Sequence, residues 1–123
     1  MIDHVSIGVS DLHLSRSFYE QVLATIGLSK LVERDGTVGF GKRYPEFWIN
    51  LRDGVAPLGN GAHICLRAPD TGAVDAFHKT ALELGATSKG APGARPEYND
   101  RYYAAFIRDP DGNRIEAVTF VNS

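Results

Sequence analysis

The chain has little of several features that would assign it to a particular class of protein. It has one cysteine among 123 residues, Cys65, so no disulfide can form within it and a reducing compartment is expected. Its apolar runs are too short to cross a bilayer, and no charged-then-apolar segment near the start indicates a signal peptide. We therefore expect a cytoplasmic protein without a membrane partner.

An excess of charge of one sign is also missing. The formal net charge is −2, which gives no basic field, so nucleic acid is not expected as a partner. The hydrophobic fraction of 43% and the charged fraction of 23% are typical of an ordinary globular protein. A chain of this length suits one domain, residues 1–123, with a core of its own.

What the chain does contain is an internal repeat. When the sequence is shifted by 59 residues, HVSIGVSDLHLSRSFYEQVL falls on HICLRAPDTGAVDAFHKTAL, and His4 falls on His63. A fixed internal period indicates one structural unit built twice. The two modules span about 1–53 and about 61–121.

Each module is predicted to be β-α-β-β-β, which gives an α+β fold with a curved mixed sheet around a cavity. β-Branched and alternating residues predict the strands, and Ser10-Asp11, Gly27 and Gly85 mark helix ends. In the first module we expect strands at 2–9, 28–33, 37–41 and 46–52, and a helix from 10–11 to about 26. In the second we expect strands at 64–68, 101–109 and 114–120, a helix at 71–84, and a long loop at 90–100.

Apolar residues spaced as on one helix face predict the buried stripes. These are Leu14, Phe18, Val22 and Ile26 in the first helix, and Val74, Phe77, Ala81 and Leu84 in the second. Two histidines, His13 and His78, lie off these stripes and are expected to be exposed to solvent.

Strand alternation predicts where the polar residues of the sheets point. If Val5, Ile7 and Val9 pack beneath a helix, His4 lies on the opposite face, and the same reasoning applies to His63. Glu116, in the last strand, also points away from the helices. The three side chains are therefore expected to converge on the concave side of the sheet.

Two imidazoles and a carboxylate form a set of metal ligands that leaves coordination positions open. Such a site suits Zn, Ni, Mn or Fe, and the types of ligand do not indicate which of these metals is bound. A single histidine in a strand is more often a hydrogen-bonded structural group. The matching positions in the repeat and the glutamate of the closing strand are what favour the metal site.

At these residues the chain resembles a known family. Residues 3–9, DHVSIGV, and 62–66, AHICL, look like the first strands of the two halves of the vicinal oxygen chelate superfamily. Residues 109–118, DPDGNRIEAV, look like its closing hairpin. The superfamily includes glyoxalase I, extradiol dioxygenases, fosfomycin-modifying enzymes and bleomycin-binding proteins.

The resemblance implies that His4, His63 and Glu116 hold a divalent metal ion. It implies a lyase, isomerase, transferase or dioxygenase whose small-molecule substrate chelates the metal through vicinal oxygens, with Glu116 as the expected catalytic residue. The alternative is a metal-free binding protein of the bleomycin-resistance type. Small members often pair modules between chains, so we expect a homodimer in which His4 of one chain lies beside His63 of the other.

The chain departs from the glyoxalase pattern in the last strand of the first module. Glyoxalase I has a fourth ligand there, whereas the position matching Glu116 is Trp48, and Asn50 lies two residues further on the same face. We therefore expect little glyoxalase I activity and a preference for an apolar or aromatic small substrate. The predicted lining of the substrate pocket is Ser6, Trp48, Asn50, Cys65 and Tyr103.

Overall fold

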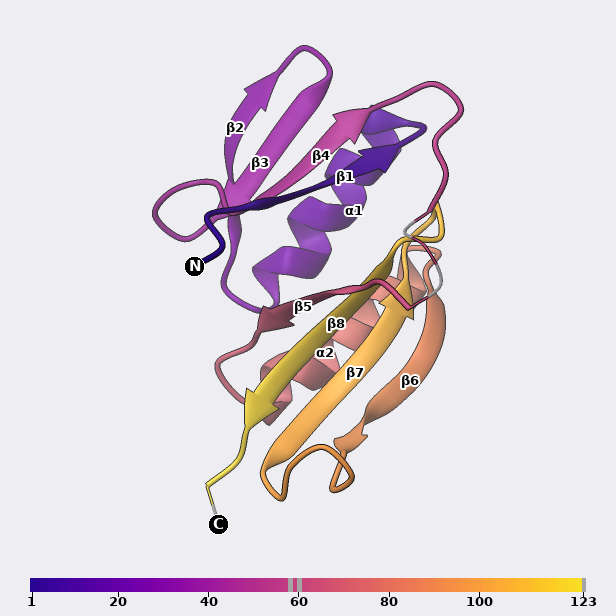
Figure 1. The fold of residues 1–123 in the computed structure, drawn as a ribbon. Helices are drawn as coiled ribbons and strands as arrows, with labels where there is room; N and C mark the ends of the chain where they lie inside the picture. Colours follow the sequence, from indigo (N-terminus) through magenta and orange to yellow (C-terminus); the bar gives the residue numbers. More distant parts are fainter. Residues whose placement is uncertain (58, 60, 123) are drawn as a thin grey trace.

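The structure is a computed structural model that describes residues 1–57, 59 and 61–122. It contains the predicted β-α-β-β-β unit twice (Figure 1). The first module consists of β1 (Val5–Val9), α1 (Leu12–Ala24), β2 (Ser29–Arg34), β3 (Thr37–Gly41) and β4 (Phe47–Leu51). The second consists of β5 (Ile64–Arg67), α2 (Thr71–Glu83), β6 (Thr87–Ala94), β7 (Tyr102–Arg108) and β8 (Arg114–Phe120). The junction between the modules includes residues 58 and 60, which lie outside the described residues.

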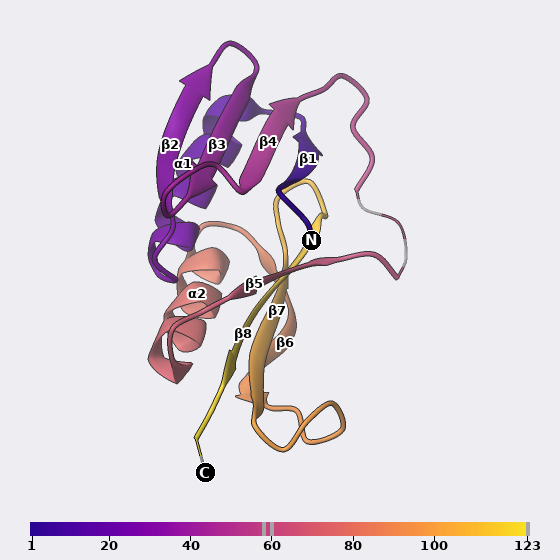
Figure 2. The ribbon, with the colours of Figure 1, turned by 60° about the vertical axis from the view of Figure 1, so that its left-hand side comes forward.

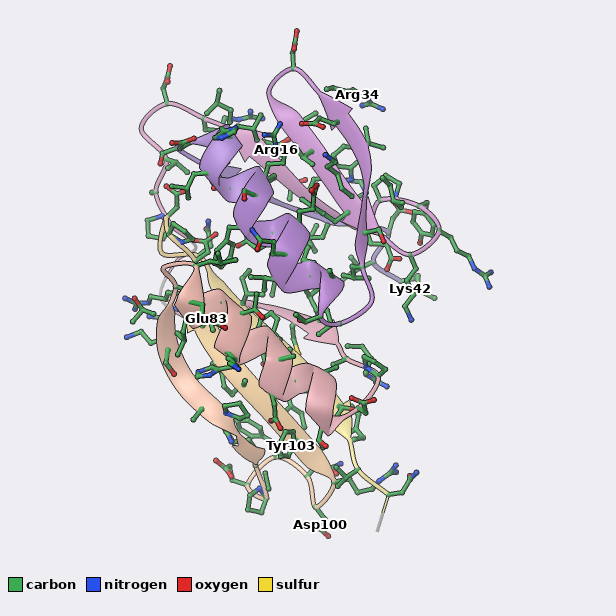
Figure 3. All side chains as sticks on the ribbon, turned by 180° about the vertical axis from the view of Figure 1, so that it is seen from behind. Arg16, Arg34, Lys42, Glu83, Asp100 and Tyr103 are labelled. Atoms are coloured by element: carbon green, nitrogen blue, oxygen red, sulfur yellow. The ribbon has the colours of Figure 1, made fainter. Side chains whose placement is uncertain are left out.

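The two sheets have the same strand order, β1-β4-β3-β2 and β5-β8-β7-β6. In each, the first strand pairs in parallel with the last, and the remaining pairs are antiparallel. Both helices lie behind the sheets in Figure 1 and in front of them in Figure 3, which shows the molecule from behind. The helices therefore cover one face of each sheet and leave the other face open.

Both helices begin where the sequence predicts. Asp11 caps α1 by accepting a hydrogen bond from the backbone N–H of Leu14 at 3.0 Å, and Asp70 caps α2 through Ala73 at 2.8 Å. Gly27 and Gly85 follow the helices with φ of 88° and 100°, a conformation that glycine adopts without a Cβ clash.

One hydrophobic core lies between the helices and the sheets and includes residues of both modules. In the predicted stripe of α1 every residue but Leu14 is buried; Leu14 is 46% exposed, and Ser15 and Tyr19 are buried in addition. The buried band is therefore wider than predicted, and it faces both its own sheet and the neighbouring α2, with which α1 is in contact (Figure 2). In α2, Val74, Phe77 and Ala81 are buried as predicted.

Two further predictions for the second module are wrong. His78 is buried rather than exposed, and its Nε2 lies 2.8 Å from the hydroxyl of Ser88 on β6. Part of the predicted loop at 90–100 belongs to β6, which pairs with β7 through two register shifts around Gly90. β6 is the edge strand of its sheet, where bulges, glycine and proline are tolerated.

The two modules are also joined by the turn before β8. The Asp109 carboxylate in this turn is buried and accepts a hydrogen bond from the Tyr19 hydroxyl of α1 at 2.5 Å. Asn113 donates to the Gly8 carbonyl at 3.2 Å, and Ser10 donates to Asp111. Among the helices described, none is long and apolar enough to cross a membrane.

Candidate functional site

The open face of the second sheet carries a buried carboxylate in contact with a histidine. Glu116 lies in β8, between Cys65 of β5 and Phe106 of β7, and is 2% exposed. Its Oε1 lies 2.8 Å from Nε2 of His63, the residue just before β5. The side chain of His63 is 45% exposed, so the imidazole reaches solvent while the carboxylate does not. Two of the three predicted metal ligands are therefore adjacent.

Tyr102 binds the other oxygen of the same carboxylate. Its hydroxyl donates a hydrogen bond to Oε2 of Glu116. Burial and this contact with Glu116 raise the pKa of Tyr102, so its hydroxyl keeps its proton at neutral pH. Tyr102 thus holds the orientation of Glu116, a role that the sequence did not indicate.

The prediction of Tyr103 as a pocket residue is wrong. Tyr103 lies on the helix side of the sheet, where its hydroxyl donates to Asp75 of α2 at 2.6 Å (Figure 3). Residues 102–106 read YYAAF, so polar and apolar residues do not alternate and the sequence does not fix which tyrosine faces the site.

Cys65 lies directly opposite Glu116 and on the same face, as predicted. Cys65 as a whole is exposed, but partial desolvation of its thiol and the neighbouring Glu116 carboxylate raise the pKa of the thiol to about 12. At neutral pH the thiol is therefore protonated, which does not suit a nucleophile.

The first sheet presents the equivalent face with a different residue in place of the glutamate. Trp48 of β4 lies opposite Ser6 of β1, just as Glu116 lies opposite Cys65 in the second sheet. Phe47 and Ile49 are fully buried and Trp48 is half-buried, so the predicted strand register is correct. The Trp48 ring packs against Gly39, where a Cβ would lie 2.9 Å from it, and the Arg34 guanidinium lies 5.7 Å from its centroid.

His4 lies just before β1 and is exposed, with Nδ1 2.7 Å from the carboxylate of Asp3. β1 begins at the left of Figure 1 and β5 at the right, and the two strands run in opposite directions. Within the described part of the chain, no three His, Cys, Asp or Glu residues are grouped so that they could hold a metal ion. One chain therefore brings His63 and Glu116 together without His4, and supplies part of the predicted ligand set.

A pocket of about 350 Å³ lies beside His63. Its side chains include His63, Lys89, Tyr98, Phe106, Arg108 and Arg114. None of the five residues predicted to line a substrate pocket contributes to this lining. Strand alternation could have indicated Arg114, which lies two residues before Glu116 on β8, whereas the sequence predicts no strand at 87–94 and so does not indicate where Lys89 points.

The comparisons with known proteins agree with this fold. The family model of the Glyoxalase/Bleomycin resistance protein/Dioxygenase superfamily matches residues 1–117. None of the curated proteins compared is significantly similar in sequence. A glyoxalase/bleomycin resistance protein from Albidiferax ferrireducens T118 has a similar crystal structure, with 34% identity and a TM-score of 0.84 over 94% of this chain and 96% of that one.

Two more distant structures show the range of proteins with this fold. A glyoxalase I mutant from Zea mays is 26% identical, with a TM-score of 0.73 over 94% of this chain and 44% of that one. A mutant of the fosfomycin resistance protein FosX from Listeria monocytogenes, in complex with Mn(II) and 1S,2S-dihydroxypropylphosphonic acid, is 15% identical, with a TM-score of 0.72 over 98% and 90%. On the family match and the 34% identity, the chain belongs to the Glyoxalase/Bleomycin resistance protein/Dioxygenase superfamily.

Proposed function

We propose that the protein is a divalent-metal-dependent enzyme that acts on a small molecule at the open face of the second sheet. The observation that carries the proposal is the contact between the buried carboxylate of Glu116 and the solvent-facing imidazole of His63. The candidate activities are those of a lyase, isomerase, transferase or dioxygenase. The proposed ion is Zn, Ni, Mn or Fe, since imidazole and carboxylate bind all four.

The environment of Glu116 supports a cation at this position. A buried carboxylate is costly unless hydrogen bonds or a positive charge compensate it. Glu116 accepts one hydrogen bond from Tyr102 and faces His63, whose imidazole is only half-enclosed. Imidazole nitrogen and carboxylate oxygen facing one another are a suitable pair of donors for a divalent ion.

The orientation of His4 supports its role as the third ligand. Its Nδ1 is held by the Asp3 carboxylate, which leaves Nε2 available, and Nε2 forms no hydrogen bond with a described residue. Metal-binding histidines commonly donate their second N–H to a carboxylate in this way. Because β1 and β5, which follow His4 and His63, begin on opposite sides of the molecule in Figure 1, the proposal assigns His4 from a second chain to each His63–Glu116 pair, in a homodimer.

The ion would act as a Lewis acid on a substrate oxygen. The residues of the chain would move the proton and hold the site in place. Glu116 is the carboxylate that can accept a proton at the site, and Tyr102 keeps this carboxylate in position. Phe106, whose ring centroid lies 6.3 Å from that of His63, forms an apolar wall beside them. Trp48 occupies the position equivalent to Glu116, so the proposal does not include the glyoxalase I reaction.

Metal content tests the proposal. Protein purified without chelator, or reconstituted with Zn, Ni, Mn or Fe, should hold about one ion per chain by elemental analysis. Replacing His63 by alanine, or Glu116 by glutamine, should remove most of it, because each variant deletes one of the donor atoms. His13→Ala, which removes an exposed histidine of α1, is the matched control and should leave the content unchanged.

A metal-free binding protein is the second candidate, and the pocket beside His63 favours it. Its volume of about 350 Å³ falls at the small end of the range of ligand sites. Wild-type protein that holds no metal after reconstitution with all four ions would overturn the enzyme proposal in favour of this one.

A further inference from the structure

The pocket beside His63 is lined with positive charge. Lys89, Arg108 and Arg114 contribute three cationic side chains, and the described lining residues include no aspartate or glutamate. The whole chain has a formal net charge of −2, so this local excess does not reflect the composition. A small cavity with several guanidinium and ammonium groups is suited to an anion.

The strand register explains why these side chains meet. Arg108 and Arg114 lie directly opposite each other in β7 and β8, two residues from the pair Phe106 and Glu116, and so share the open face with it. Like charges directly opposite in a sheet are destabilising. The register therefore places two guanidinium groups side by side at this end of the sheet, where both line the pocket.

Lys89 reaches the same pocket from β6. The register shift between Ser88 and Gly90 places Lys89 at an irregular position, and bulges of this kind reorient side chains. Ser88 faces α2 through its contact with His78, whereas Lys89 lines the pocket on the open side. Neither Lys89 nor Arg108 forms an ion pair with any residue that the structure describes. Their charges are therefore not neutralised by a neighbouring carboxylate.

An aromatic wall lies next to these cations. The absence of a side chain at Gly90 makes room for the Phe106 ring, since a Cβ there would lie 2.9 Å from it. The Arg95 guanidinium covers Phe106 at 5.5 Å from the centroid and donates to the carbonyls of Ala91 and Gly93. Arg95 therefore holds the Phe106 ring in place, whereas Arg108 and Lys89 are available to a ligand.

We propose that this pocket binds the anionic group of the substrate, a carboxylate or a phosphate-like oxyanion, next to His63 and Glu116. The inference deepens the proposed function by naming the substrate class: a small anionic molecule with a flat apolar part that packs on Phe106. Arg108 and Arg114 would hold the oxyanion by charge-assisted hydrogen bonds, and Lys89 would add a point charge.

Titrations of the ¹⁵N-labelled full chain test this inference. The probes are inorganic phosphate, benzoate and the neutral isostere benzamide at constant ionic strength, followed through the Nε–H resonances of the arginines. Phosphate, benzoate or both should shift the signals of Arg108 and Arg114, and benzamide should not. Arg108→Gln and Arg114→Gln should each weaken binding by about tenfold, which corresponds to losing one charge-assisted hydrogen bond. Binding of phosphate alone would assign a tetrahedral anion, and binding of benzoate alone a carboxylate.

Arg101→Gln is the matched control, because Arg101 lies next to the other end of β7 and binds the Val121 carbonyl. Arg108→Lys keeps the charge and should retain part of the affinity if Arg108→Gln does not fold. Equal affinity of wild type and the Arg108→Gln/Arg114→Gln double variant, or benzamide binding as tight as benzoate, would overturn the inference. The titrations are made with protein as purified and after treatment with chelator, so that a failure to bind metal is distinguished from a failure to bind anions.

Discussion

At the scale of single residues, the position of Trp48 separates this chain from a four-ligand site. Ser6 corresponds to Cys65 after the 59-residue shift, and in the sheets Ser6 pairs with Trp48 as Cys65 pairs with Glu116. Gly39 stands where the second module has Phe106, and its missing side chain makes room for the indole. The two modules thus share a backbone register while one offers a carboxylate and the other an aromatic ring.

Trp48→Glu should therefore restore a carboxylate at the equivalent position and tighten metal binding. An added oxygen ligand worth about 1.4 kcal/mol would lower the metal Kd tenfold. Asn50→Glu is the control, because it adds the same charge to the same face two residues away. The measurement is a competition titration with a metal-sensitive dye. If both variants tightened binding equally, the effect would be one of net charge, and the assignment of Trp48 to the ligand position would be wrong.

At the scale of elements, the sequence predicted the repeat, both helices and seven of the eight strands, because strong caps, glycine stops and β-branched runs mark them. The sequence does not predict β6, because its residues, TSKGAPGA, include two glycines and a proline. The strand also pairs through bulges at the edge of its sheet. The sequence does not identify the tyrosine that faces Glu116, because polar and apolar residues do not alternate in YYAAF. The burial of His78 is not predicted either, because it depends on a contact with β6 that the periodicity of the helix does not indicate.

The contact between α1 and the turn before β8 joins the two modules, and it can be tested by a single hydroxyl. Tyr19→Phe removes one of the donors to the buried carboxylate of Asp109, which keeps its bonds from the backbone of Asp111 and Asn113. Losing a hydrogen bond to a buried charged group costs about 1.5–3 kcal/mol. We expect this loss in the free energy of unfolding by urea denaturation.

Tyr44→Phe makes the same chemical change at a tyrosine that is 52% exposed, and it should change stability by less than about 0.5 kcal/mol. Equal stabilities of the two variants would show that the Tyr19 hydroxyl does not contribute to holding the modules together.

At the scale of the whole molecule, the arrangement of the modules determines where a complete site can form. The two sheets share a core and turn their open faces away from the helices, yet β1 begins at the left of Figure 1 and β5 at the right. The first module therefore presents one of the three proposed ligands, His4, and the second presents the other two, His63 and Glu116. A twofold dimer in which the first module of one chain faces the second module of its partner would complete two equivalent sites.

This dimer makes a prediction that no site within one chain can satisfy. His4→Ala and His63→Ala chains should each bind almost no metal alone, since every site in either homodimer lacks one histidine. When the two variants are mixed and allowed to exchange subunits, each mixed dimer regains one site with both histidines. About half the dimers are mixed, so metal content should return to about a quarter of that of wild type. Elemental analysis of the mixture measures this directly, with each variant alone as the control. No recovery after exchange, or a monomer by light scattering at micromolar concentration, would place the site within a single chain and contradict the dimer.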